Sequence, residues 1–175
     1  TTSKSKGISS APPQPRTNKP AFTESGQVRS SNLRVKRSFS DEEVDQFLEE
    51  SFEYISRFFE ASLQELSERN SQITTRFRRV DSNSFSASIY DSGKRAAECT
   101  VWLGSRNSLQ NGIAYSSGII QSRNQYNELL SVGNDGYSLH LSALGMSIMG
   151  PRPAKEMSPE GAAELFWGML IQRLQ

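Results

Sequence analysis

Hydrophobic side chains recur at intervals of three and four residues between Ser40 and Asn70, with glutamates mostly between them. This period predicts an amphipathic helix. Ser40 begins the segment and Glu43 follows three residues later, the capping-box pattern that starts a helix. The apolar positions are Val44, Phe47, Leu48, Phe52, Ile55, Phe58, Phe59, Leu63 and Leu66. We therefore expect one long helix that ends near Arg69 or Asn70.

Beyond this segment the hydrophobic period shortens to two residues, which is typical of strands with one buried and one wetter face. The period is clear in residues 73–78, 85–90, 97–103 and 137–143, and weaker at about 113–119 and 128–133. Turn sequences at residues 91–94 and 134–136 favour antiparallel hairpins. Because the connections are too short for helical crossovers, we expect an antiparallel meander of about six strands.

A second helix is expected after the connector Gly150-Pro151-Arg152-Pro153. Ser158 is a favourable N-cap, Pro159 suits the first helical position, and an apolar stretch follows. The sequence thus predicts an α+β fold with a long N-terminal helix, a meander sheet and a C-terminal helix. One interpretation is that each helix covers a different face of the sheet, which would give three layers.

Composition divides the chain at residue 39. Residues 1–39 contain eight basic residues and one acidic residue, net +7, whereas residues 40–175 contain twelve and eighteen, net −6. The first segment is rich in Ser, Pro, Lys and Arg and holds too few large apolar side chains to build a core. We expect residues 1–39 to be a disordered basic linker or tail and residues 40–175 to form a single α+β domain.

The charge division limits the partners. A domain with a net charge of −6 repels phosphates on average, so we expect nucleic acid to contact only the basic tail, if any part. The sequence has neither an apolar run of transmembrane length nor a signal-peptide pattern, so no membrane contact is expected. The single cysteine, Cys99, cannot form an internal disulfide, which favours a reducing, cytoplasmic location.

Residues with obvious catalytic chemistry are scarce. The chain has one histidine and one cysteine and no motif for a phosphate loop, a dinucleotide site, a zinc cluster or a serine nucleophile. Cys99 shares a predicted strand face with Val101 and Leu103, so we expect it in the core. His140 lies on the opposite strand face from Leu139, where a surface histidine is expected and a general base or pH sensor is the alternative. Neither a cofactor nor a metal site is predicted, and whether the chain is an enzyme stays uncertain.

Two groups of polar residues are candidate ligand sites. The first is the glycine-flanked loop of residues 104–112, where Arg106, Asn107 and Gln110 suit an anion or a nucleobase edge. The second is the outer face of the sheet, where cations and aromatic rings can stack a base or nucleotide. Its members are Arg76, Arg78, Tyr90, Trp102 and His140. Polar hairpin turns and a helix-covered sheet face are the competing structural interpretations.

These features favour a non-catalytic accessory module that senses a ligand or binds a protein within a larger intracellular polypeptide. The basic segment and the missing initiator Met suggest an N-terminal effector domain in the same polypeptide, or a separate protein partner. One alternative is a ligand-binding or enzymatic domain with a cavity between the long helix and the sheet. Another is an oligomerisation domain that forms a homo-oligomer, because the long helix contains heptad-like stretches.

Overall fold

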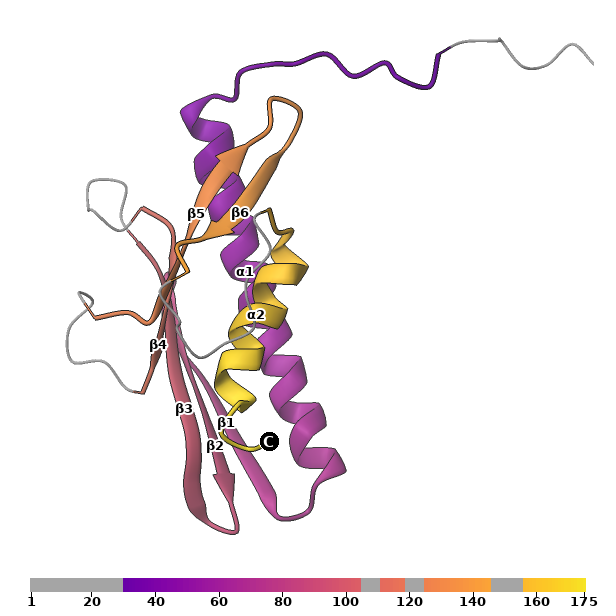
Figure 1. Ribbon diagram of the computed structural model, residues 1–175. Coiled ribbons are helices and arrows are strands. Elements are labelled where there is room, and N and C mark those ends of the chain that lie inside the picture. Colours follow the sequence, from indigo (N-terminus) through magenta and orange to yellow (C-terminus); the bar gives the residue numbers. More distant parts are fainter. Residues whose placement is uncertain (1–29, 105–110, 119–124, 146–155) are drawn as a thin grey trace, which may run out of the picture. The chain divides into compact units, whose positions relative to one another are not determined.

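The first helix, α1 (Asp41–Arg69), begins at the predicted capping box. The Ser40 hydroxyl accepts from the Glu43 amide (3.2 Å), and the Glu43 carboxylate accepts from the Ser40 amide (2.8 Å). The Ser40 amide and the Arg37 side chain together hold the pKa of Glu43 below its usual range. The structure, a computed structural model, describes residues 30–104, 111–118, 125–145 and 156–175 (Figure 1).

Six strands follow α1 and form one antiparallel sheet in the order β1-β2-β3-β4-β5-β6, which confirms the predicted meander. They are β1 (Ile73–Asp81), β2 (Ser84–Asp91), β3 (Lys94–Leu103), β4 (Ile113–Ser117), β5 (Glu128–Asn134) and β6 (Leu139–Ala143). The last strand starts two residues later than its hydrophobic pattern predicts. The reason is a turn in which the Asp135 carboxylate accepts from the amides of Tyr137 and Ser138, each at 2.7 Å.

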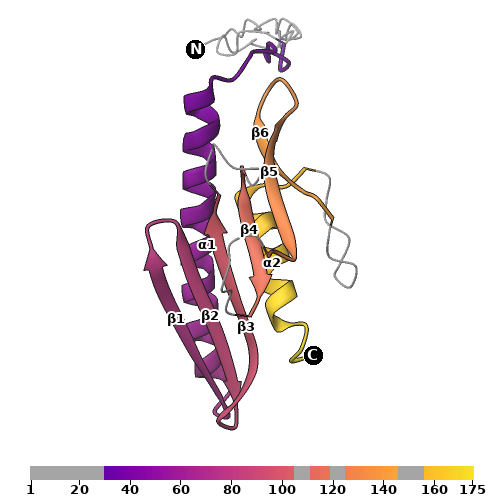
Figure 2. The ribbon, with the colours of Figure 1, turned by 90° about the vertical axis from the view of Figure 1, so that its left-hand side faces the viewer.

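The final helix, α2 (Pro159–Ile171), lies beside α1 on the same face of the sheet, so the three-layer expectation is wrong (Figures 1 and 2). The Trp167 ring of α2 packs edge-on against Phe58 and Phe59 of α1, with centroids 6.4 and 5.6 Å apart. α1 packs against β1, β2 and β3 and leaves the apolar inner face of the later strands uncovered. α2 buries that remainder, as the 5.2 Å contact between Tyr115 and Phe166 shows. The fold therefore has two layers.

The core lies between the sheet and the helical layer. The Phe85 ring of β2 lies 5.3 Å from Phe59, 5.9 Å from Phe52 and 5.3 Å from Phe77, measured between centroids. Phe52, Phe59 and Phe85 are almost completely inaccessible to solvent. These rings occupy the space between α1 and the sheet, which is where one alternative prediction placed a ligand cavity.

Arg79 fastens the end of β1 to α1. Its guanidinium binds the Glu53 carboxylate, donates to the Ser56 hydroxyl (3.0 Å) and lies over the Phe52 ring (5.0 Å). It also donates to the Ser82 carbonyl in the β1–β2 turn (2.5 Å). One side chain thus joins strand, turn and helix, which local sequence patterns do not reveal.

Substitution of Arg79 tests this fastening. Arg79→Met keeps the apolar stem but removes every donor, so we expect the free energy of unfolding in urea to fall by about 1–3 kcal/mol. Arg78→Met is the matched control, because Arg78 lies on the other face and has no hydrogen bond or ion pair with the described part of the chain. The control should change stability by no more than about 0.5 kcal/mol. Equal losses in both variants would show that Arg79 has no special role.

Candidate functional site

The sheet face that points away from both helices holds all five residues of the second predicted site, but not as one group. Across β1 and β2, Arg76 pairs with Ser88 and Arg78 pairs with Ser86, while Tyr90 lies two residues beyond Ser88 on the same face. The structure therefore places Arg76, Arg78 and Tyr90 close together on two neighbouring strands.

Trp102 and His140 share this face but lie apart from that group. Trp102 is 1% exposed and packs with Ala114, Leu129 and Tyr126, so its ring is inaccessible to a stacking ligand. His140 is on β6, at the opposite edge of the sheet from β1. Its imidazole covers Gly133 so closely that a Cβ added there would lie 2.5 Å from Nε2. The five predicted residues do not form one site, and a ligand-binding role for them stays a prediction.

Arg76 and Arg78 of β1 differ from Arg95 of β3, the third arginine on this face. Arg95 pairs with Glu98 (3.3 Å) and lies over the Tyr90 ring (5.9 Å). The Ser88 hydroxyl also donates to Glu98 (3.1 Å). Arg76 and Arg78 are exposed and make no hydrogen bond or ion pair within the described residues. They present two guanidinium groups, two residues apart, to any anionic partner.

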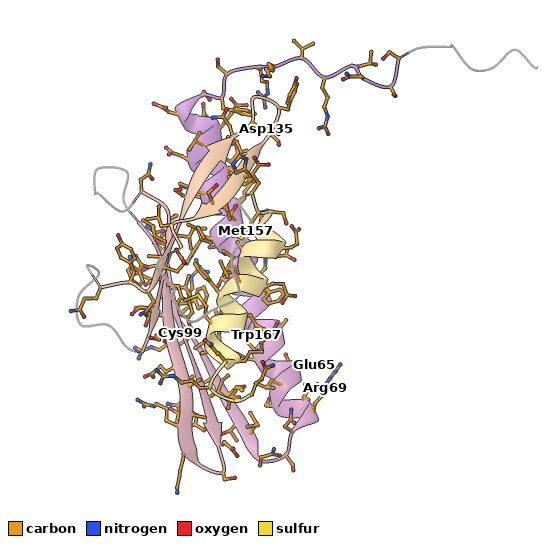
Figure 3. The ribbon with its side chains drawn as sticks, viewed as in Figure 1. Glu65, Arg69, Cys99, Asp135, Met157 and Trp167 are labelled. Carbon is orange, nitrogen blue, oxygen red and sulfur yellow. The ribbon has the colours of Figure 1, made fainter. Side chains whose placement is uncertain are left out.

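The two edges of the sheet differ in whether a further segment pairs with them. At the β6 edge, Leu141 and Met157 exchange two backbone hydrogen bonds of 2.8 and 2.9 Å, so the segment that precedes α2 pairs with part of that edge (Figure 3). At the other edge, β1 is nine residues long and pairs with β2 alone (Figure 2). Within the described residues, β1 is the open edge.

The ladder shows which β1 residues face that open edge. The Ser92 amide donates to the Gln72 carbonyl (2.9 Å), so even-numbered residues of β1 bond to β2. The Leu103 amide donates to the Asn83 carbonyl (2.8 Å), so odd-numbered residues of β2 form their backbone hydrogen bonds with β3. Even-numbered residues of β2 therefore form theirs with β1. By either route, Thr75 and Phe77 direct their N–H and C=O groups outward. Neither forms a further backbone hydrogen bond with the described residues.

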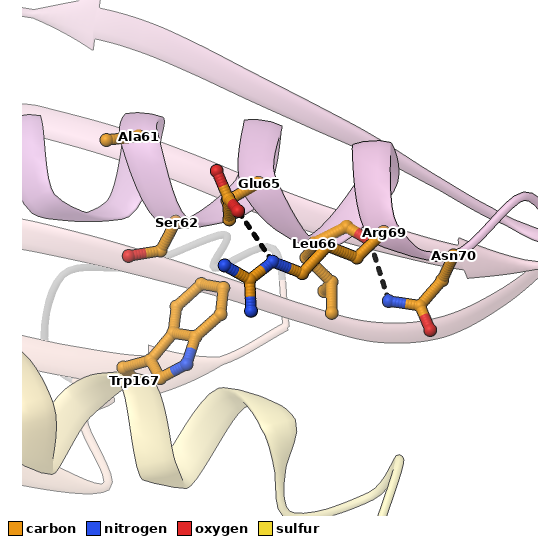
Figure 4. A pocket seen from close by; sticks show the side chains of 7 residues that line it. All are labelled: Ala61, Ser62, Glu65, Leu66, Arg69, Asn70 and Trp167. Atoms are coloured by element: carbon orange, nitrogen blue, oxygen red, sulfur yellow. Dashed lines mark hydrogen bonds and ion pairs between the residues drawn. The ribbon is translucent and has the colours of Figure 1, made fainter.

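A pocket of about 460 Å³ lies between the C-terminal half of α1 and α2 (Figure 4). It is lined by Ala61, Ser62, Glu65, Leu66, Arg69, Asn70 and Trp167. The indole of Trp167 forms one wall, and Arg69 Nε is already paired with Glu65 at 2.5 Å. Sequence reasoning missed this pocket because its walls come from distant segments. The arginine of this pocket already has a carboxylate partner, whereas Arg76 and Arg78 have none among the described residues.

The loop site predicted from Arg106, Asn107 and Gln110 lies outside the described residues and stays a prediction. The base of that loop is described, and there the Gly104 amide donates to the Gly112 carbonyl (2.7 Å). A smaller pocket of about 170 Å³ adjoins it. That pocket is lined by Asp45, Leu48, Glu49, Asn83, Leu103, Gly104 and Asn111.

Cys99 lies in the core, as its strand position predicts, and burial raises the pKa of its thiol far above the usual range. Burial likewise raises the pKa of the neighbouring Tyr115 hydroxyl. Such a thiol stays protonated at neutral pH and is a poor nucleophile. Across the described ranges, no group of three or more His, Cys, Asp or Glu residues is placed to hold a metal ion. No helix in those ranges is both long and apolar enough to cross a membrane.

The end of the predicted basic linker contacts the domain. The Arg37 amide donates to the Gly136 carbonyl (2.9 Å), and its guanidinium pairs with Glu43 (2.6 Å) and lies over the Phe39 ring (4.3 Å). Lys36 Nζ lies 5.9 Å from the centre of the Tyr137 ring. Lys36 and Arg37 thus have partners within the chain. Arg34–Gln175 form one compact unit, so these last residues of the predicted linker belong to it.

Comparison with known proteins identifies a family. No solved structure matches the chain. A protein of Sinorhizobium fredii (strain NBRC 101917 / NGR234), named uncharacterized protein y4lF, is 44% identical over 147 residues. These residues are 84% of this chain and 45% of that protein, so the chain spans less than half of the relative's length. The Y4lF protein domain matches residues 74–172, from β1 through α2. The chain therefore belongs to the Y4lF protein domain family.

Proposed function

We propose that this chain is a non-catalytic protein-interaction module of a longer polypeptide, and that the β1 side of its sheet binds the partner. The observation that carries the proposal is the open edge of β1, with Arg76 and Arg78 beside it. An unpaired strand edge presents a row of backbone donors and acceptors that another polypeptide can satisfy. The β6 edge is less suited, because Met157 already pairs there.

The exposed side chains of β1 support the same surface. Val80 is 54% exposed, and Arg76 and Arg78 extend from the face that no described helix covers. Arginine is enriched at protein interfaces, and an exposed strand edge can take up a strand of a partner. The length of the S. fredii relative, of which the match covers 45%, supports a place within a larger polypeptide.

Selection of displayed peptides tests the proposal. A random peptide library is selected against the folded chain, and each enriched peptide is mapped by backbone amide exchange. We expect enriched peptides to protect residues 73–81 and to lose binding to the Arg76→Gln/Arg78→Gln double variant. Lys94→Gln, which removes one positive charge at the start of β3, should keep their affinity. If the selected peptides protect the helical layer and leave β1 unchanged, this surface has been wrongly assigned.

A further inference from the structure

We infer that the β1 edge accepts an extended acidic segment of its partner as an added antiparallel strand; this inference rests on the function proposed above. It specifies the chemistry of the partner at that surface: free backbone groups spaced as in a strand, and carboxylates at alternate positions.

The backbone of β1 provides hydrogen-bonding groups for an added strand. Thr75 and Phe77 each direct one N–H and one C=O outward, so an added strand forms four main-chain hydrogen bonds at these two residues. Such bonds fix the direction and register of a bound polypeptide without reading its side chains. A nucleic acid has no comparable row of alternating donors and acceptors, which favours a protein partner.

The arginines provide positive charges for carboxylates of the added strand. Because Thr74, Arg76 and Arg78 bond to β2, they occupy the non-hydrogen-bonded positions of a new ladder on the other side. Facing residues at such positions approach most closely, with Cα atoms about 4.5 Å apart. Carboxylates two residues apart on the added strand therefore meet Arg76 and Arg78. Oppositely charged pairs across strands are stabilising.

The residue between the two carboxylates faces the other side of the sheet. There it lies next to Phe77, which is half-buried and packs against Phe85 at 5.3 Å. A β-branched apolar residue suits this position, because it continues the core at its border. The expected recognition pattern is acidic, apolar, acidic.

One antiparallel register between two copies of this chain is unfavourable at the same edge. Antiparallel pairing of two β1 strands centred on Phe77 sets Arg76 of one copy opposite Arg78 of the other. Like charges that face each other across strands are destabilising. The charges of β1 thus oppose pairing of two copies in this register, whereas they favour an acidic partner.

The test uses a labelled, end-blocked peptide, Thr-Val-Glu-Val-Glu-Val-Thr, and fluorescence anisotropy with the full chain. We expect saturable binding and no binding of the peptide with Lys in place of Glu. Arg76→Gln/Arg78→Gln should weaken binding at least tenfold, and Lys94→Gln should leave it unchanged. Binding that survives the double arginine substitution, equal binding of the Lys peptide, or effective competition by single-stranded oligothymidylate would each overturn the inference.

A proline substitution tests the backbone contacts separately. Thr75→Pro removes an N–H that faces the open edge, so the β1–β2 ladder keeps its bonds while the peptide loses one. Thr75→Val is its control, because both variants lose the 3.0 Å bond from the Thr75 hydroxyl to the Leu63 carbonyl. We expect Thr75→Pro to bind at least tenfold more weakly than Thr75→Val. Equal affinity in these two variants contradicts strand addition; if Thr75→Pro does not fold, the arginine variants decide.

The two proposals fail in different ways. Selected peptides that protect residues 73–81 but lack acidic residues would disprove the acidic partner and keep the interaction surface. Selected peptides that never protect β1 would disprove both.

Discussion

Phe59→Ala is expected to lower the free energy of unfolding by about 3–5 kcal/mol, the usual cost of removing a large buried aromatic side chain. Phe59 is 0% exposed and is the residue at which both helices and the sheet meet. Its ring contacts Phe85 of β2 at 5.3 Å and Trp167 of α2 at 5.6 Å. Truncation leaves a cavity among rings held by three elements, so the site cannot collapse easily. Chemical denaturation monitored by circular dichroism measures the loss.

Phe58→Ala is the matched control for this prediction. Phe58 is the neighbouring phenylalanine on α1 but is only half-buried, and it contacts Trp167 from the rim at 6.4 Å. Because less apolar surface is uncovered, we expect it to cost about half as much or less. A loss at Phe58 equal to that at Phe59 would show that the core is centred elsewhere.

Gly112→Ala is expected to lower the free energy of unfolding by about 3 kcal/mol or more, because it forces a backbone clash. A Cβ at Gly112 would lie 2.1 Å from the Leu130 carbonyl oxygen on the neighbouring strand. A flexible side chain could rotate away from such a contact, but a strand carbonyl cannot. Relief therefore requires that β4 and β5 separate at their first pairs.

Gly168→Ala is expected to raise the free energy of unfolding, whereas Gly112→Ala is expected to lower it. Gly168 lies in α2, and a Cβ there meets nothing within 4 Å. Alanine is favoured over glycine within a helix, so we expect a gain of about 0.5–1 kcal/mol. Stabilisation by both alanines, or destabilisation by both, would contradict these local assignments.

Features encoded in short stretches could be predicted from the sequence. The start of α1 follows from Ser40 and Glu43, and the start of α2 from Ser158 and Pro159. The β2–β3 hairpin follows from its turn residues, and Cys99 was placed in the core by its strand face. In each case the deciding contacts join residues close in the chain, or the alternation of one strand fixes the buried face.

Features that depend on tertiary packing could not be predicted in this way. The face that α2 covers depends on how much of the sheet α1 leaves uncovered. The hydrophobic period of the sequence does not give this area. Trp102 lies on the outer face, as its period predicts, yet it is buried by packing with Leu129 and Tyr126. The open edge did leave a signal, since Arg76, Arg78 and Arg79 crowd one strand and charges are common on edge strands. Only the strand order shows that the strand with these arginines lies at an edge of the sheet.

The most direct measurement is residue-resolved amide hydrogen exchange along β1 by NMR. If β1 is the open edge in the register described, the amides of Thr74, Arg76 and Arg78 exchange slowly and those of Thr75 and Phe77 exchange rapidly. Addition of the acidic peptide then slows exchange at Thr75 and Phe77. Slow exchange at all five positions without peptide, or the reverse alternation, would contradict an edge that is free to receive a partner strand.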